Sequence, residues 1–381
     1  MAKTMLMITS VASMIKQFNM DNIAILQELG YQVHVATNFE HGSTMNAEEN
    51  EKLKTELEQL RVVIHQVDFP RGTGSPKIIM KVLKQLTNVM KVNDFHFIHC
   101  HSTIGGICGR IIGHKFHIKV IYTAHGFQFY KGSSLKSWLI IYPIEKYLSR
   151  YTDILITINQ EDFQLARLKF HAKNIEYVPG IGIDVEKISN IEIDRDRERK
   201  NLGISEHSIF ILSVGELSNR KNHAMVLRAL NSIKQKNIIY GICGIGDNKQ
   251  YLLDLAKKSG IEEQFILFGY RTDIITIMKA ADLFIFPSFL EGLPVSLMEA
   301  MAAGVPVMAS AIRGNTDLIE DGVNGYLFSP KDKAEIKNKI NRYIDSNKQE
   351  ATCFSIRSQE KIKSFDEKIV IRYMNNIYNL I

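Results

Sequence analysis

Residues 289–307 read FLEGLPVSLMEAMAAGVPV, and this stretch decides the fold of the chain around it. The run before it, FIFPS, has the apolar composition of a buried strand that ends by Pro287. Gly292 permits a tight turn, and Pro294 suits the first position of a helix, where its missing N–H costs nothing. The glycine and proline of AGVP then predict the helix end. The stretch therefore predicts a strand, a turn and a helix, as in a parallel α/β sheet.

Two glutamates, Glu291 and Glu299, flank the start of this predicted helix. Backbone N–H groups in a first helical turn have no partner within the helix, so they form an anion site suited to a diphosphate. The turn that supplies them consists of Leu293, Pro294 and Val295, with the residues up to 297. A carboxylate only accepts hydrogen bonds, so each glutamate can take two hydroxyl donors of a ribose or hexose. A capped helix with two solvated glutamates is the alternative.

A basic pair follows another predicted strand in ILSVGELSNRKNH, residues 211–223. Arg220 and Lys221 stand at a predicted helix start, where positive charge would complement a diphosphate. Two solvated basic residues in a loop are the alternative. Glycine turns follow the next two strands, in GICGIGD and FGYRTDI. Neither has GxGxxG spacing, so a dinucleotide fingerprint is not supported.

His125 ends a predicted strand in TAHGFQFYKG, residues 123–132. A histidine at that place can hydrogen-bond a bound sugar or a developing charge, and a satisfied core histidine is the alternative. The other histidines lack the spacing of metal ligands, and Asp194-Arg195-Asp196 lies in a run of alternating charge instead of after an apolar strand. We therefore expect no metal and no cofactor.

Composition bounds the class of protein. The 381 residues, 45% hydrophobic, suffice for two domains, and no apolar run has the length that spans a membrane. Four cysteines without CxxC pairing fit a reducing compartment, so we expect a cytoplasmic location. Residues 61–173 hold 16 Lys and Arg against 6 Asp and Glu, within a net charge of +6. This half favours anionic partners. KVLKQLTNVMK, residues 81–91, fits acidic lipid headgroups or a phosphorylated substrate, with a solvated amphipathic helix as the alternative.

Short apolar runs alternate with longer amphipathic segments along the chain, which is the rhythm of parallel sheets covered on both faces. The rhythm stops in a polar stretch between Gly180 and His207 and then restarts. We predict two Rossmann-like, doubly wound α/β domains, residues 1–187 and 188–364, facing each other across a cleft. The tail, residues 365–381, has the spacing of a helix with one apolar face.

Together these residues resemble the retaining glycosyltransferases of family 4, which have the GT-B fold. FLEGLPVSLMEAMAAGVPV followed by RGNTDLIEDGVNGYLF is similar to the donor-site signature of that family. SMIKQFNMDNIAILQELGYQVHVATNF, YTAHGFQFYKG, PIEKYLSRYTDILITINQEDF and YVPGIGID are similar to the branch that builds capsules and exopolysaccharides. The resemblance covers nearly the whole chain.

The resemblance implies transfer of a sugar, with retention of its anomeric configuration, from a nucleotide diphosphate sugar such as a UDP-sugar. The acceptor would be a polyisoprenoid-diphosphate-linked glycan, and the enzyme would lie peripherally on the anionic inner face of the cell membrane. No metal and no nucleic-acid partner is implied. Two other functions stay open: a nucleotide-sugar isomerase of the 2-epimerase type on the same fold, and a non-catalytic sugar-nucleotide-binding protein.

The resemblance also implies roles for single residues. Glu299 would hold the nucleotide ribose, and the catalytic groups would be Glu291 at the donor sugar, Lys221 at the diphosphate and His125 at the transferred sugar. The rest of the donor site would consist of Arg220, Gly215, Gly244, Gly269, Tyr270, Leu293, Pro294 and Val295. The acceptor would be received by Ser10, Ser13, Gln17, His101 and Gly105. The helix 365–381 would cross back onto the first domain.

One position departs from the family pattern. Many members carry an arginine directly after the glycine of GELSNRK, where this chain has Glu216. A carboxylate near a diphosphate is repulsive, so either Glu216 points away or Arg220 supplies part of the missing charge.

Overall fold

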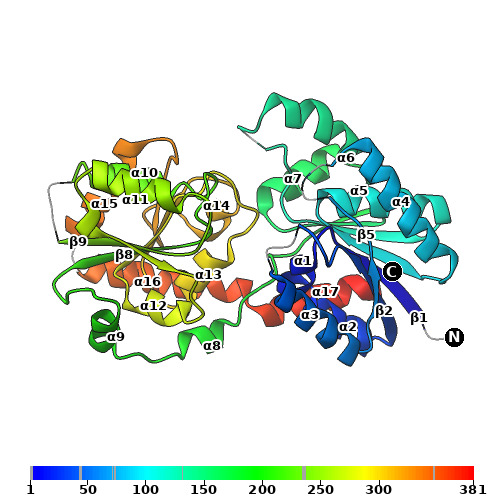
Figure 1. Ribbon diagram of the computed structural model, residues 1–381, viewed down its shortest axis with the longest axis horizontal. Helices are drawn as coiled ribbons and strands as arrows, with labels where there is room; N and C mark the ends of the chain where they lie inside the picture. The colour runs from blue at the N-terminus through cyan, green and yellow to red at the C-terminus, as the bar shows by residue number, and fades with distance from the viewer. Residues whose placement is uncertain are drawn as a thin grey trace. The chain divides into compact units, whose positions relative to one another are not determined.

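The computed structural model describes residues 3–42, 45–70, 72, 74–130, 132–233, 237–345 and 348–381. The chain divides into two compact units, which are coloured along the chain in Figure 1. The first consists of Met1–Ile181 with Lys368–Ile381, and the second of Gly182–Glu367. Each unit is built on one parallel β-sheet with helices on both faces, which confirms the predicted fold class.

The strands of the first unit are β1 (Lys3–Ile8), β2 (Tyr31–Thr37), β3 (Val63–Gln66), β4 (Phe97–His101), β5 (Lys119–Ala124), β6 (Ile154–Thr157) and β7 (Asn174–Tyr177). Within the described residues they form one sheet in the order β3-β2-β1-β4-β5-β6-β7, with neighbouring strands parallel. The strand order reverses between β1 and β4. The loops after these two strands therefore run in opposite directions and leave a place for a ligand.

Two apolar cores cover the faces of this sheet, because side chains alternate along each strand. Met5 and Met7 belong to one core, and Leu6 and Ile8 to the other. The first core is covered by α1 (Ala12–Phe18), α2 (Met20–Glu28), α3 (Ala47–Gln59) and α17 (Glu367–Asn379). The second is covered by α4 (Pro76–Lys91), α5 (Thr103–Phe116) and α7 (Gln160–Lys169). Figure 1 shows α17, the red helix, as part of the first unit.

The strands of the second unit are β8 (Ile209–Val214), β9 (Ile238–Cys243), β10 (Phe265–Gly269), β11 (Leu283–Phe286), β12 (Val307–Ser310) and β13 (Tyr326–Phe328). In the part of the chain that the structure describes, their order is β10-β9-β8-β11-β12-β13, and all neighbours are parallel. The order reverses between β8 and β11. The second sheet thus repeats the switch point of the first.

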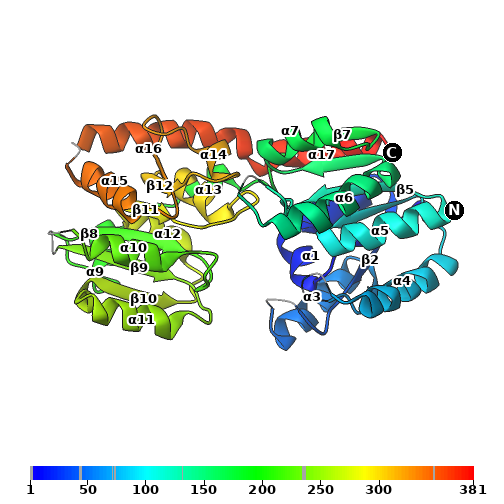
Figure 2. The ribbon, with the colours of Figure 1, turned by 90° about the horizontal axis from the view of Figure 1, so that it is seen from above.

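Helices also cover both faces of the second sheet (Figure 2). One face carries α10 (His223–Leu230), α11 (Lys249–Lys258) and α15 (Lys333–Asp345). The other carries α9 (Arg195–Asn201), α12 (Ile274–Ala280) and α13 (Val295–Ala302), with α16 (Lys348–Ile362) against α13. The remaining helical segments include α8 (Val185–Ser189), α14 (Asn315–Leu318), the π-helix η1 (Ser137–Ile141) and α6 (Tyr142–Leu148). No helix within the described ranges is long and apolar enough to cross a membrane.

The two chain segments at which the units divide are hydrogen-bonded to each other. Ile183 N donates to the Phe365 carbonyl at 3.2 Å, and Glu367 N donates to the Ile183 carbonyl at 3.0 Å. A Cβ on Gly182 would lie 2.5 Å from Glu367 Cα, so only glycine fits this approach. The units accordingly divide after Ile181 and after Glu367. The sequence predicts these two boundaries at residues 187 and 364.

Candidate active site

The loops after β8 and β11 meet at the switch point of the second sheet. Lys221 Nζ donates to Glu291 Oε1 at 2.8 Å, and Arg220 Nη1 donates to the same oxygen at 2.9 Å. The backbone ties the loops as well, because Phe289 N donates to the Arg220 carbonyl at 2.9 Å. The structure thus joins three residues that were singled out in separate parts of the sequence.

The pair of Lys221 and Glu291 is largely withdrawn from water. The side chains are 12% and 10% exposed, and Lys221 Nζ lies 4.6 Å from the centre of the Phe286 ring. Burial lowers the pKa of Lys221, and the Glu291 carboxylate opposes that effect. A cation held in this environment interacts more strongly with an anion than a solvated lysine does.

Arg220 also contacts the side chain of Glu216. The Glu216 carboxylate lies 3.9 Å from Arg220 Nη2, and both side chains are about half exposed. Glu216 therefore faces the outer arginine, whereas Lys221 pairs with Glu291. Arg220 thus contacts both carboxylates.

Glycines let three loops approach one another beneath Lys221. A Cβ on Gly215 would lie 3.1 Å from Lys221 Cε, and one on Gly244 would lie 1.9 Å from the Gly215 carbonyl oxygen. Gly244 N donates to the Gly269 carbonyl at 2.7 Å. Tyr270 comes next in the chain and is 72% exposed. The backbones of the three predicted glycines thus lie close to one another, and Tyr270 projects into solvent next to Gly269.

Helix α13 begins at Val295, and Pro294 precedes it in an extended conformation with ψ of 115°. The expectation that Pro294 is the first helical residue is therefore wrong by one position, because its ψ is not helical. Within the described residues, the N–H groups of Val295, Ser296 and Leu297 donate to no acceptor. The first turn of α13 thus has the free donors that an anion needs.

Glu299 lies one turn further along α13. Burial raises the pKa of its carboxyl to about 7. No cation or hydrogen-bond donor of the described chain pairs with it. A half-buried carboxyl without a partner is unfavourable, and a hydroxyl donor from a ligand would relieve that cost.

Arg313 was not singled out from the sequence. It is 5% exposed, follows β12, and its Nε donates to the Glu291 carbonyl at 3.2 Å. The next residue, Gly314, approaches the Gly292 carbonyl so closely that a Cβ would lie 2.2 Å from it. The rule that ligands bind beyond strand ends would have found Arg313, since it stands just past an apolar strand.

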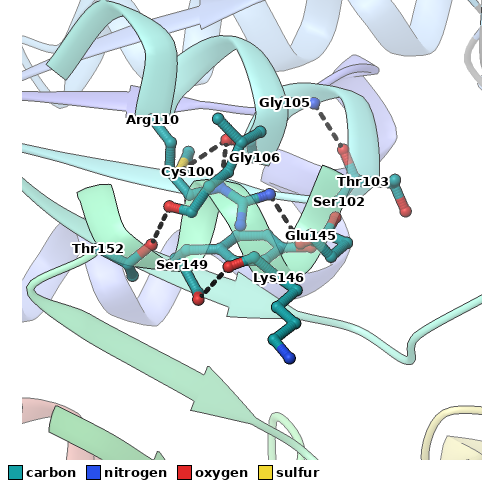
Figure 3. A network of polar contacts seen from close by, with 12 residues as sticks. Cys100, Ser102, Thr103, Gly105, Gly106, Arg110, Glu145, Lys146, Ser149 and Thr152 are labelled. Carbon is teal, nitrogen blue, oxygen red and sulfur yellow. Dashed lines mark hydrogen bonds and ion pairs between the residues drawn. The ribbon is translucent and has the colours of Figure 1, made fainter. Parts of the chain in front are cut away.

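The first unit places other predicted residues at its own switch point. Ser102 Oγ donates to Ser10 Oγ at 3.1 Å. Gly105 N donates to Ser102 Oγ at 3.4 Å, as Figure 3 shows. Ser102 has a φ of 64°. A non-glycine residue in this left-handed region is strained, and such strain concentrates at functional loops.

His101 and His125 contact each other behind these serines. His101 Nδ1 and His125 Nε2 are 3.2 Å apart, and His99 Nδ1 lies 2.8 Å from the hydroxyl of Tyr378 on α17. Burial lowers the pKa of His125 to about 4 and that of His99 to about 3, and it holds the pKa of His101 well below its usual value. All three imidazoles are neutral at pH 7, so His125 can serve there as a hydrogen-bonding group and not as a cation.

Two predicted acceptor residues stand apart from this group. Ser13 is buried in α1, and Gln17 is exposed on the same helix. In the described residues neither contacts the other predicted acceptor residues through a side-chain hydrogen bond. Nor do three His, Cys, Asp or Glu side chains gather anywhere in the described ranges as metal ligands would.

The chain matches two family profiles that divide it as the fold does. The profile "Glycosyltransferase Family 4" matches residues 22–187, and "Glycosyl transferases group 1" matches residues 194–358. The chain is 31% identical over 347 residues to a Bacillus subtilis (strain 168) protein that is named glycosyltransferase EpsD, and this covers 89% of this chain and 87% of that protein. It is 30% identical over 275 residues, 70% of each chain, to the Escherichia coli UDP-Gal:alpha-D-GlcNAc-diphosphoundecaprenol alpha-1,3-galactosyltransferase.

A solved structure shares the fold over its full length. The crystal structure of Anabaena Alr3699/HepE in complex with UDP superposes with a TM-score of 0.77, at 20% identity, over 100% of both chains. The fold is thus GT-B, as the resemblance implies. With profiles over both units and a relative above 30% identity along most of its length, the chain belongs to glycosyltransferase family 4.

Proposed function

We propose that this glycosyltransferase moves a sugar from a UDP-sugar to a polyisoprenoid-diphosphate-linked glycan during the synthesis of a surface polysaccharide. The observation that carries the proposal is the cluster of Lys221, Arg220 and Glu291 beside the free N–H groups of α13. The names of the relatives support the substrate classes, since the Escherichia coli relative uses UDP-Gal and a diphosphoundecaprenol acceptor by name.

Lys221 and Arg220 would hold the diphosphate without releasing Glu291. An ammonium has three N–H donors, and Glu291 takes one of those of Lys221, so two are left for phosphate oxygens. The guanidinium of Arg220 has further donors of its own. Glu291 thus fixes both cations in place before a ligand arrives, which avoids reorganisation during the reaction.

Glu291 would also contact the donor sugar. Both cations bind its Oε1, so Oε2 can accept a hydroxyl of the sugar. Glu299 would accept the ribose hydroxyls, which donate to a carboxyl that has no other described partner. The two glutamates would therefore act at opposite ends of the donor, as the family resemblance implies.

The reaction would break the bond between the anomeric carbon and the diphosphate oxygen, and the electron pair would stay on the diphosphate. The acceptor oxygen would bond to the anomeric carbon on the same face, and its proton would pass to the departing phosphate oxygen. Lys221, Arg220 and the N–H groups of α13 would stabilise the charge of the leaving UDP. We propose that no metal is needed, because these groups supply the positive charge.

On the first unit, Ser10, Ser102 and Gly105 would bind acceptor hydroxyls, and neutral His125 would donate or accept one hydrogen bond from a sugar. The acceptor is lipid-linked in this proposal, so the enzyme would work peripherally at the inner face of the cell membrane.

The test is incubation of the purified protein with a panel of labelled nucleotide sugars and a membrane lipid extract. We expect label from one UDP-sugar to enter the lipid fraction, in the presence of a chelator as well as in its absence. Conversion of a UDP-sugar without any acceptor would instead establish an isomerase. Nucleotide binding with no turnover on any extract would establish a binding protein.

A further inference from the structure

An apolar groove of about 540 Å³ lies on the first unit between α5 and α6. Its walls are made mainly of Ile107, Ile111, Pro143, Ile144, Tyr147 and Leu148. The side chains from α6 recur at helical spacing, so they share one face of that helix. Nothing in the proposed sugar transfer uses this groove.

Apolar side chains around the groove face water. Leu139 and Ile140 on η1 are 75% and 47% exposed, and Ile144 and Tyr147 on α6 are 38% and 55% exposed. Single exposed apolar residues are ordinary, but a contiguous group of them marks a surface that binds an apolar partner.

A buried ion pair joins the two helices that form the groove. Arg110 of α5 donates from Nη2 to Glu145 Oε2 of α6 at 2.8 Å, and each side chain is 1% exposed (Figure 3). Arg110 Nε donates to the Gly106 carbonyl at 2.8 Å, which fixes the guanidinium to its own helix. Since a buried pair tolerates little displacement without losing its partner, the two walls keep their spacing.

A second pocket, of about 270 Å³, is lined in part by the same two side chains, His114 and Tyr151. Their rings stack at 3.8 Å where the pocket and the groove adjoin. The cationic side chains that line the pocket are Lys119, Arg150 and Lys173, with His114 and His117 beside them, and the one carboxylate among its lining residues is Asp153.

The charges in this pocket are not balanced. Lys173 pairs with Asp153 at 2.6 Å, and Lys119 Nζ donates to the carbonyl oxygen of Ile381 at 2.6 Å. Arg150 makes no ion pair in the described part of the chain, and its guanidinium lies 6.0 Å from the Tyr147 ring centre. An apolar groove therefore leads into a pocket with a spare guanidinium.

We propose that the groove and the pocket together bind an anionic membrane phospholipid, with an acyl chain in the groove and the phosphate beside Arg150. Burial of methylene groups would drive the first contact, and a guanidinium is well suited to a phosphate. The inference rests on the proposed membrane location, but it does not depend on sugar transfer.

The position of the basic pocket separates this lipid from the glycan acceptor. Lys119 begins β5 and Lys173 directly precedes β7, so the pocket lies at the amino ends of the strands. Ser10 and His125 lie beyond the carboxyl ends. The 14 residues of α5 run between the two ends, a distance of about 20 Å. A diphosphate in the basic pocket would hold its first sugar far from the acceptor loops, so a bilayer lipid fits the pocket better.

The single tryptophan of the chain gives a direct readout. Trp138 lies on η1 and its ring is 5.4 Å from that of Tyr142 on α6. Vesicles of phosphatidylglycerol with brominated acyl chains should quench its fluorescence, and brominated phosphatidylcholine vesicles should quench it much less. Ile144→Asn should weaken binding to phosphatidylglycerol vesicles about tenfold, because it removes exposed apolar area. Arg150→Gln should weaken it about fivefold.

Leu168→Asn and Lys169→Gln on α7 are the matched controls, since both side chains are exposed on the same unit. They should bind vesicles as the unchanged protein does. Equal quenching by both lipids, or equal binding of the Ile144 and Arg150 variants and the controls, would overturn the lipid site. If sugar transfer is absent but these vesicle results hold, the proposed function fails and the lipid site stands.

Discussion

The loops beyond the two sheets occupy the same place in the same fold, yet their chemistry is opposite. In the second unit Lys221 and Arg220 converge on one carboxylate oxygen of Glu291. In the first unit His101 and His125 face each other as neutral imidazoles because burial lowers their pKa values. One switch point is built for charge and the other for hydrogen bonds to uncharged groups.

This difference in charge indicates which substrate each unit suits. A diphosphate brings negative charge that the second unit can neutralise, whereas the hydroxyl groups of a glycan need donors and acceptors without net charge. The following changes test the contrast.

Lys221→Ala should have the largest effect on the charged site of the second unit. We expect kcat/KM for transfer to fall about 10²–10³-fold, because a preorganised donor to the leaving diphosphate is lost. Steady-state kinetics with the donor identified by the panel measures this. Lys257→Ala on the exposed side of α11 is the control, and an equal loss in both variants would remove Lys221 from the site.

Glu299→Gln should stabilise the unbound protein at alkaline pH. The pKa of this carboxyl is raised by burial from 4.5 to about 7, so the folded state binds its proton more tightly than the unfolded state. Folding stability therefore falls as pH rises from about 4.5 to 7, by up to about 3 kcal/mol. Urea unfolding across this range should show that fall in the parent and lose most of it in the variant. Parallel curves would contradict the assignment.

The same substitution should weaken nucleotide binding. The ionised carboxyl accepts both ribose hydroxyls, so the UDP affinity of the parent protein should rise as pH increases through about 7. Above that pH, the parent should bind UDP about 10-fold more tightly than Glu299→Gln does. Calorimetric titration at several pH values measures both. An affinity that is independent of pH in the parent would separate Glu299 from the ribose.

The smallest effect is expected at the histidines. Because the pKa of His125 is about 4 and that of His101 is lower than usual, neither imidazole should gain a proton between about pH 5 and 8. Histidine NMR resonances, assigned with His125→Gln, should stay constant over this range. A titration midpoint near pH 6.5 for His125 would contradict the contrast between a charged and an uncharged site.

Much of the charged site could be predicted because its residues follow apolar strands. Lys221 and Glu291 each stand a few residues beyond a strand, and parallel strands bring such loops together. The shared oxygen of Glu291, and the turn of Glu216 toward Arg220, could not be read from spacing, since they depend on how side chains pack in three dimensions.

In the basic first half, composition predicts the charge of a segment but not which of its faces is buried. The segment 81–91, which the sequence offers for contact with acidic lipids, forms most of α4, where Val82, Leu86 and Met90 lie in the core and the lysines are exposed. That contact stays a prediction. The exposed apolar surface lies instead on η1 and α6. That surface depends on the approach of α5 to α6 through Arg110 and Glu145, a contact 35 residues apart that no local pattern reveals.

The most direct test of the charged donor site is the ratio of UDP affinity to uridine affinity, measured by calorimetry in the parent protein and in Lys221→Ala. Uridine has the ribose and base but no diphosphate, so the ratio isolates the contribution of the cations. We predict that the parent binds UDP at least about 10²-fold more tightly than uridine and that Lys221→Ala lowers this ratio about tenfold or more. An unchanged ratio in the variant would contradict the assignment of the diphosphate to the cluster of Lys221, Arg220 and Glu291.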